Sequence, residues 1–319
     1  MSLFLQGFSS LFQSIMMIFV IAFVAGILIR KKIVSQEHIR GLSIITINIL
    51  LPSLIFSKIT GNLEPAEFPI WWIVPLIAMG TTGIGLSLAW FVFRKQLPEK
   101  RNLLPLSSLM NAAYLILPIG QVIYPAQFDE FALYVSLYVL GISPLVWTVG
   151  KFFITQRENE KYSWRDLMSP PLWANILGLL FVLTGLRKFI PNFLTDSIAL
   201  MGEATVPVAT LILGATLGTL PWKFIPIIKD LSWVVFIKLI AVPGIVFLLL
   251  QGSALQSEYP LLCKLLILEA SAPAATALII QVRRYGGDQN KIGTIMLFSY
   301  LICLIFIPFW LALWTVFGG

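Results

Sequence analysis

Long unbroken apolar runs dominate this 319-residue sequence and restrict its fold class more than any other feature. The runs are about 17 to 24 residues long, the length that an α-helix needs to cross a hydrocarbon core roughly 30 Å thick. Because lipid offers no partner to free backbone groups, such segments must be helical. The sequence therefore predicts an all-α membrane protein with ten transmembrane helices. The ten runs are 8–29, 40–59, 70–93, 103–124, 130–153, 171–187, 195–219, 231–251, 259–282 and 290–316.

Composition and the placement of charge exclude a soluble or nucleic-acid-binding protein. Charged residues make up 12% of the chain and hydrophobic residues 58%, whereas a soluble domain carries about twice that charged fraction. The net charge of +7 comes largely from basic clusters in every second loop, such as 30–32, 94–101 and 283–291. By the positive-inside rule these loops face the cytoplasm, so both termini lie on the extracytoplasmic side of the cell membrane. We expect a multi-pass protein whose partner is the lipid bilayer, with no nucleic-acid partner.

A polar loop at 156–169 divides the ten spans into two sets of five. It is the expected cytoplasmic linker between a first five-helix repeat, 1–155, and a second, 170–319. Because each half has an odd number of spans, the second half enters the membrane in the opposite sense to the first. Any repeat between the halves is therefore inverted.

Four prolines inside the predicted spans support such a repeat. Pro52 and Pro118 are 66 residues apart, as are Pro207 and Pro273, and one offset of 155 residues relates the two pairs. A proline removes a backbone donor and clashes with the preceding turn, so each one is a candidate helix break. Ordinary kinks are the alternative. Breaks at matching positions of two inverted halves indicate a transporter site, where half-helix N-termini attract an anion and freed carbonyls suit Na⁺ or a proton-bearing group.

The residues around the breaks in the fourth and ninth spans are small or polar and form the candidate substrate site. Their amides and hydroxyls can donate hydrogen bonds to a carboxylate, as recognition of a small acid requires. No full positive charge lies in either segment, which favours a monoanion or a weakly charged substrate. The candidate substrate-binding residues are Asn111, Tyr114, Pro118, Gln121, Pro273 and Thr276.

Four segments together resemble the auxin efflux carrier family, which includes plant PIN exporters and bacterial malonate-type carriers. They are residues 48–56, 111–118, 206–214 and 272–276. The resemblance covers essentially the whole chain and implies the fold of the bile-acid sodium symporters. In that fold, spans 1, 2, 6 and 7 form a scaffold, and spans 3–5 and 8–10 form a transport domain. The resemblance further implies that helices 4 and 9 cross at their prolines, that movement is elevator-like, and that the protein is a homodimer through the scaffold.

Two acidic residues inside spans are candidates for a coupling ion or proton. Glu269 lies about 15 Å deep in the ninth span, at the position where the resemblance to bile-acid symporters implies a glutamate that helps to hold Na⁺. Glu203 precedes Pro207 by four residues, as Glu269 precedes its own proline. Neutral, hydrogen-bonded structural acids are the alternative. Lys238 and Lys264 lie at shallower depth, where a long stem can also snorkel to the interface.

The sequence as a whole predicts a secondary active transporter of a small organic anion. The substrate class is a carboxylate, auxin-like or a dicarboxylate, and coupling to Na⁺ or H⁺ stays open. A membrane sensor for a ligand or lipid, or an anion channel, is the alternative. We expect no enzyme, because His38 is the only histidine and no nucleophile motif is present. Cys263 and Cys303 lack metal-type spacing, so no metal site and no cofactor beyond a bound Na⁺ is expected.

Overall fold

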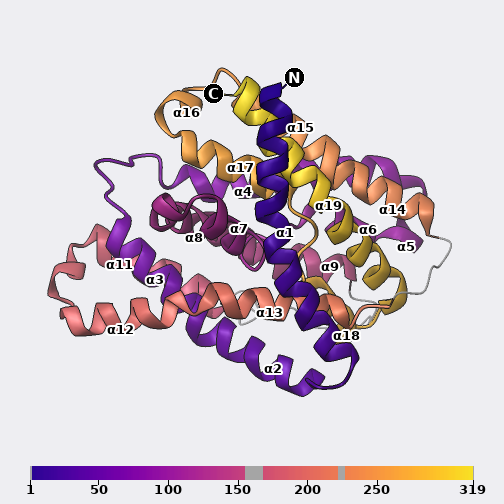
Figure 1. Cartoon of the computed structure of the whole chain (residues 1–319), viewed down its shortest axis with the longest axis horizontal. Helices are drawn as coiled ribbons and strands as arrows, with labels where there is room; N and C mark the ends of the chain where they lie inside the picture. Colours follow the sequence, from indigo (N-terminus) through magenta and orange to yellow (C-terminus); the bar gives the residue numbers. More distant parts are fainter. Residues whose placement is uncertain (1, 155–167, 222–226, 319) are drawn as a thin grey trace.

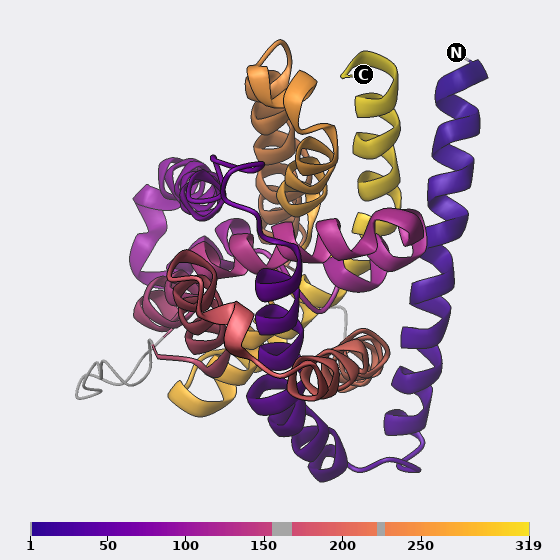
Figure 2. The same ribbon diagram turned by 90° about the vertical axis from the view of Figure 1, so that its left-hand side faces the viewer.

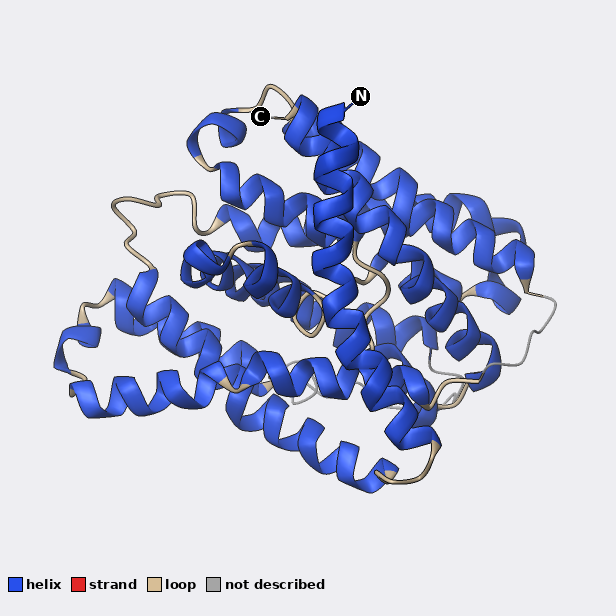
Figure 3. Cartoon of the chain, viewed as in Figure 1, coloured by secondary structure: helices blue, strands red, loops and turns tan. Residues whose placement is uncertain are grey.

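The computed structural model describes residues 2–154, 168–221 and 227–318. Every named element within those ranges is a helix, and the connections are short loops (Figure 3). The predicted linker at 156–169 falls almost entirely outside the described residues. The all-α class predicted from the apolar runs is therefore confirmed for the described part of the chain.

Seven helical stretches are long and apolar enough to cross a membrane. Each one overlaps one of the predicted runs, which confirms a multi-pass membrane protein. The stretches are built from α1 (Ser2–Arg30); α2 (Gln36–Ile45), η1 (Thr46–Leu50) and α3 (Leu51–Asn62); α4 (Ile73–Phe93) with α5 (Leu97–Lys100); α8 (Phe128–Leu145), η4 (Val146–Gly150) and α9 (Lys151–Ile154); α12 (Asn192–Glu203) and α13 (Thr205–Gly218); α14 (Ile228–Val235), η6 (Phe236–Ala241) and α15 (Val242–Leu250); and α19 (Gln289–Phe317).

The other three predicted runs are a short helix and two interrupted ones. The sixth run corresponds to α11 (Pro170–Leu183), which is apolar but only 14 residues long. The fourth run is split into α6 (Leu103–Ser108) and α7 (Ile116–Ile123), and the ninth into α17 (Pro260–Ser271) and α18 (Ala277–Tyr285). The count of ten spans and the inverted relation between the two halves thus stay predictions.

The first helix packs along α13 through small residues. A Cβ atom placed on Gly214 would lie 2.0 Å from the carbonyl oxygen of Ala22, and one placed on Gly218 would lie 2.7 Å from the Cα atom of Gly26. Only glycine permits such an approach, and small residues four positions apart are a common device where two membrane helices cross closely. Figure 1 shows α1 running the full height of the molecule and crossing α13.

Both termini lie at the same end of the molecule (Figures 1 and 2). The N-terminal part of α1 runs beside the C-terminal part of α19, where the Phe4 and Phe309 rings stack edge to face at 5.9 Å. Termini at one end are what an even number of spans requires. The side of the membrane on which they lie stays a prediction from the charge pattern.

Candidate functional site

The two interrupted helices meet at their interruptions. The Asn111 N–H donates to the Pro273 carbonyl at 3.0 Å, and the Ala275 N–H donates to the Leu109 carbonyl at 3.1 Å. Met110 and Ala274 therefore face each other as an isolated antiparallel bridge. Backbone groups that leave a helix in the middle of a membrane need partners inside the protein. Here each interruption supplies the partners of the other.

The interruptions and the prolines do not coincide in both halves. Residues 272–276 leave helical geometry around Pro273, but the first interruption spans 109–115, ahead of Pro118. Pro118 is the third residue of α7, where its missing N–H costs nothing, because the first four N–H groups of a helix have no intrahelical acceptor. Pro52 directly follows the π-helical turn η1 within the continuous helix Gln36–Asn62, and Pro207 is the third residue of α13, after the turn at Ala204. The predicted break of the fourth helix at Pro118 is therefore wrong, because the chain leaves helical geometry before that residue.

A tyrosine on α19 joins the two interruptions. The Asn111 amide donates to the Tyr300 hydroxyl at 2.6 Å, and that hydroxyl donates to the Ala274 carbonyl at 2.9 Å. Tyr300 is fully buried and Asn111 is nearly so. One hydroxyl thus holds a side chain of the first interruption and a backbone oxygen of the second, so the arrangement at the crossing is fixed from α19.

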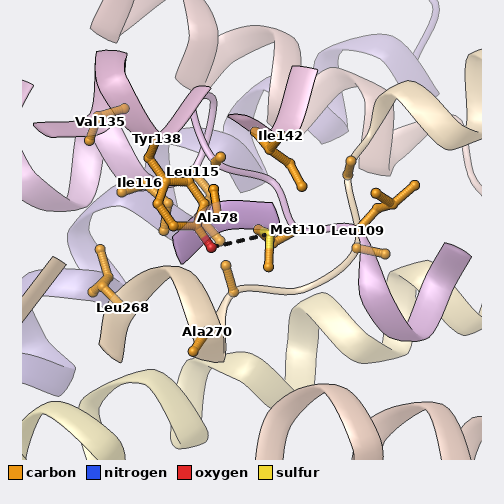
Figure 4. Close-up of a cluster of buried hydrophobic side chains, with 14 of the residues drawn as sticks. Ala78, Leu109, Met110, Leu115, Ile116, Val135, Tyr138, Ile142, Leu268 and Ala270 are labelled. Atoms are coloured by element: carbon orange, nitrogen blue, oxygen red, sulfur yellow. Dashed lines mark hydrogen bonds between the residues drawn. The ribbon is translucent and has the colours of Figure 1, made fainter. Parts of the chain in front are cut away.

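Buried side chains of α8 cover the opposite side of the crossing. Tyr138 points its hydroxyl at the Met110 sulfur, 3.6 Å away, and Leu268 and Ala270 of α17 lie close by (Figure 4). A sulfur atom is a weak acceptor, so this contact adds packing rather than a strong hydrogen bond. The crossing is therefore held by apolar packing on this side and by a hydrogen-bonded hydroxyl on the other.

A cleft of about 340 Å³ opens beside the crossing. Both interruptions line it, together with residues of η1, α3, α8, η4, α11 and α18. The Tyr114 hydroxyl has no hydrogen-bond partner among the described residues. A largely apolar cleft with a few polar groups and one charge is typical of a small-molecule site. The polar lining residues are Asn111, Tyr114, Ser143, Ser169, Thr276 and Arg284.

Half of the predicted substrate residues line this cleft. Asn111, Tyr114 and Thr276 do so, whereas Gln121 is exposed on α7 outside it. Pro118 and Pro273 are buried beside the crossing without lining the cleft.

Sequence reasoning missed Ser143, Ser169 and Arg284. Arg284 is the second-last residue of α18 and was counted only as a topological loop charge. Its proximity to a predicted break, eleven residues after Pro273, was the available signal.

The predicted coupling residue Glu269 lies deep in the protein near a lysine. Glu269 on α17 and Lys238 on η6 are both buried to within 1% exposure. Neither the two carboxylate oxygens nor the ammonium nitrogen has a hydrogen-bond partner among the described residues. The two groups interact electrostatically with each other, and the carboxylate also with Tyr138. Because a single buried charge is costly, this setting favours the two groups either both neutral or both charged over one charged alone.

The other two ionisable residues singled out from the sequence differ from this pair. Glu203 is the last residue of α12 and is exposed, not buried. Lys264 on α17 is half-buried, with its ammonium nitrogen 5.7 Å from the centre of the Tyr124 ring. A cation over an aromatic face is stabilised by the ring quadrupole. Neither residue lines the cleft.

Seven candidate spans, two interrupted helices paired through their backbones and an adjoining cleft define a polytopic membrane protein with discontinuous helices. The chain belongs to the membrane transport protein family, whose sequence profile matches residues 10–163 and 155–311. This confirms the resemblance to auxin efflux carriers, and the family is one of transporters.

Similar proteins come from archaea and from a plant. An uncharacterized transporter of Methanothermobacter thermautotrophicus is 23% identical over 93% of this chain and 96% of its own length. A second uncharacterized transporter, from Methanocaldococcus jannaschii, is 25% identical over 87% of this chain and 90% of its own length. The Arabidopsis thaliana protein PIN-LIKES 5 is 28% identical over 46% of this chain and 39% of its own length.

Proposed function

We propose that this protein is a secondary active carrier of a small organic anion, with its substrate site in the cleft beside the crossing. The observation that carries the proposal is the pairing of two interrupted helices next to a cleft that contains one arginine. Interrupted helices at the centre of a membrane protein are retained where they line a cavity. Transport would follow elevator-type alternating access, with α6, α7, α17 and α18 in the moving part.

The architecture proposed for this function is ten helices in two inverted five-helix repeats. Seven continuous spans, α11 and the two interrupted pairs account for ten. The reciprocal hydrogen bonds about Met110 and Ala274 are the pattern that a local two-fold axis between the repeats would generate. A homodimer through the scaffold and extracytoplasmic termini belong to the same proposal.

The cleft favours a monocarboxylate with an apolar body. Helices α7 and α18 both begin at the interruptions, so their partial positive charges point toward the crossing. Arg284 adds one full positive charge, and the hydroxyls of Tyr114 and Thr276 add donors. Trp147 is among the largely apolar remaining residues of the lining. One arginine among apolar walls matches a single carboxylate better than two, which favours an auxin-like acid over a dicarboxylate.

We assign coupling to Glu269 with Lys238 rather than to Glu203. Glu269 and Lys238 are buried, interact electrostatically and have no hydrogen-bond partners among the described residues, whereas Glu203 is exposed. A carboxylate in this setting changes charge by taking up a proton or by binding Na⁺, and either event alters its attraction to the neighbouring ammonium. That change is the means by which an ion gradient would bias the position of α17.

Transport and its site can be tested together in liposomes. Electrogenic currents on a solid-supported membrane would be recorded for aromatic and aliphatic carboxylates, with and without Na⁺ and across pH. Arg284→Gln should raise the half-saturating substrate concentration at least about tenfold, the effect of losing one charged hydrogen bond. Arg283→Gln is the matched control, because Arg283 donates to Thr219 at 2.9 Å and does not line the cleft.

Each alternative has its own signature in this assay. A channel would give a conductance that does not saturate with substrate. A sensor would be stabilised against heat by one carboxylate but would carry no current. A saturable current that is equally weakened in both arginine variants would reject the cleft as the substrate site while leaving a carrier in place.

A further inference from the structure

A second cavity lies against Tyr300 and is almost wholly apolar. It measures about 520 Å³ and is bounded by α1, α13 and α19. Its outer walls include Val20, Phe23 and Leu301, each between 46% and 62% exposed, so the cavity opens sideways into the bilayer. Tyr300, which holds both interruptions, lines its inner wall. None of its lining residues belongs to the candidate substrate cleft.

This apolar cavity continues into a basic one at the end of α1. This basic cavity measures about 430 Å³ and is lined by Lys32, Ser35 and Thr219 among others. Arg30 and Gly218 line both cavities, so the two are contiguous. None of the described residues that line either cavity is acidic. The combined groove is thus apolar within the membrane and positively charged where α1 ends.

The length of the apolar part matches one leaflet. Its lining on α1 runs from Met16 to Ile27, which is about 16 Å of helix at 1.5 Å per residue. Half of a hydrocarbon core is about 15 Å thick. The basic cavity therefore lies at the depth at which a phospholipid whose chain fills the groove would place its phosphate.

Lys32 has an unusual backbone conformation at the mouth of the groove. Lys32 is the only non-glycine residue with positive φ (59°) among the described residues. It follows α1 in the turn where the Ile33 N–H donates to the Leu28 carbonyl at 3.0 Å, a helix ending that usually takes glycine. A side chain there strains the backbone, so a glycine would serve the turn better. A lysine at this position places a cation at the mouth of the groove.

From this geometry we infer that the groove between α1, α13 and α19 is a binding site for an anionic phospholipid. One acyl chain lies in the apolar cavity against Tyr300, and the phosphate lies beside Arg30 and Lys32. Arg30 also donates to the Leu220 carbonyl at 3.0 Å, which fixes its guanidinium at the boundary between the two cavities. The positive charge selects an anionic headgroup over a zwitterionic one.

Binding can be measured on the purified protein in detergent, by native mass spectrometry and thermal unfolding. The probes are phosphatidylglycerol, phosphatidylcholine with the same chains, and inorganic phosphate. Phosphatidylglycerol should bind and raise the unfolding temperature, phosphatidylcholine should bind less tightly, and phosphate alone should have no effect. Lys32→Gly, which suits the backbone, should weaken phosphatidylglycerol binding about fivefold, the contribution of one basic residue near a membrane surface. Lys31→Gln, next along the chain and outside the lining, is its control.

The apolar cavity proposed to hold the acyl chain is tested by filling it with a larger side chain. Leu301→Trp should weaken phosphatidylglycerol binding about tenfold, because excluding about two methylenes from the groove has that effect. Ile305→Trp, on the same helix and exposed outside the groove, is the matched control. If Leu301→Trp does not fold, Val20→Trp fills the groove from the opposite wall.

Several results would overturn the inference. Equal binding of the two phospholipids would mean annular lipid only, and stabilisation by phosphate alone would mean a free-anion site. Competition between phosphatidylglycerol and a transported carboxylate would make the groove part of the substrate route. Binding unchanged in both Lys32→Gly and Leu301→Trp would place the lipid elsewhere.

Discussion

Tyr300→Phe tests the claim that one hydroxyl holds the crossing together. The substitution removes a donor and an acceptor at once, while the ring and its packing stay. The Asn111 amide, bonded at 2.6 Å, and the Ala274 carbonyl, bonded at 2.9 Å, would both lose their partner. Ala274 is 1% exposed, so water cannot replace the hydroxyl at that carbonyl without opening the site.

The expected loss in the free energy of unfolding is larger than the loss of an ordinary hydrogen bond between membrane helices would give. A buried polar group left without a partner costs about 1 to 3 kcal/mol, so two such groups predict a loss of about 2 to 6 kcal/mol in the free energy of unfolding. Side-chain hydrogen bonds between membrane helices contribute only about 0.6 kcal/mol on average, because the unfolded state finds other partners. Two groups fixed at helix interruptions have fewer such alternatives, so we expect the larger loss.

The assay is reversible unfolding in mixed micelles, combined with amide hydrogen exchange at residues 109–115 and 272–276. Faster exchange confined to both segments is the expected accompaniment of the lost stability. Tyr285→Phe is the control, since that ring is also buried and its recorded contacts, with Lys151 and Arg284, are made by the ring that phenylalanine keeps. A loss below about 1 kcal/mol for Tyr300→Phe, equal to that of the control, would refute the role of the hydroxyl as a brace.

Three further predictions concern packing, pH and coupling. Gly214→Val should destabilise the protein by about 3 kcal/mol or more by forcing α1 from α13, whereas Gly80→Ala, in open space, should not, as thermal unfolding would show. The Arg187 guanidinium, which holds both Glu64 oxygens at 2.6 and 2.7 Å, keeps the pKa of that exposed carboxyl below its ordinary value. Its contribution to stability is therefore present above the unfolded pKa and lost as pH falls through the lower folded pKa, so unfolding temperatures measured from pH 6 to 3 should drop less in Glu64→Gln than in wild type. Glu269→Gln should abolish the Na⁺ or pH dependence of substrate current while leaving substrate binding within about threefold, as equilibrium binding would show.

The class of the protein was predictable from sequence because the bilayer imposes it. An apolar run long enough to cross lipid has only one available conformation, so the helices followed from the runs alone. The burial of Glu269 was also predictable, since its depth within a run is a matter of counting residues. The exposure of Glu203 was not, because sequence depth does not say which face of a helix meets another helix.

The substrate cleft was predicted only in part, because a pocket depends on which distant segments meet. Asn111 and Thr276 could be named from their closeness to the breaks, and both line the cleft. Ser143 and Ser169 come from other helices, and their hydroxyls, 3.0 Å apart, meet only through the packing of α8 against the start of α11. No local pattern marks that meeting.

The position of the first interruption shows where local chemistry ends and tertiary structure begins. Pro273 cannot donate to the Glu269 carbonyl one turn earlier, and that oxygen instead accepts the Ala272 N–H at 3.2 Å, so the second interruption is written into the sequence. Residues 109–115 hold no proline or glycine, and Pro118 disturbs only the turn before it by freeing the Tyr114 carbonyl, so no local feature opens residues 109–113. They open because the second interruption exposes a carbonyl at Pro273 and an N–H at Ala275, and an extended backbone beside them satisfies both at once. Pro273 thus marks one break locally, whereas the full extent of the other depends on the segment that lies opposite it.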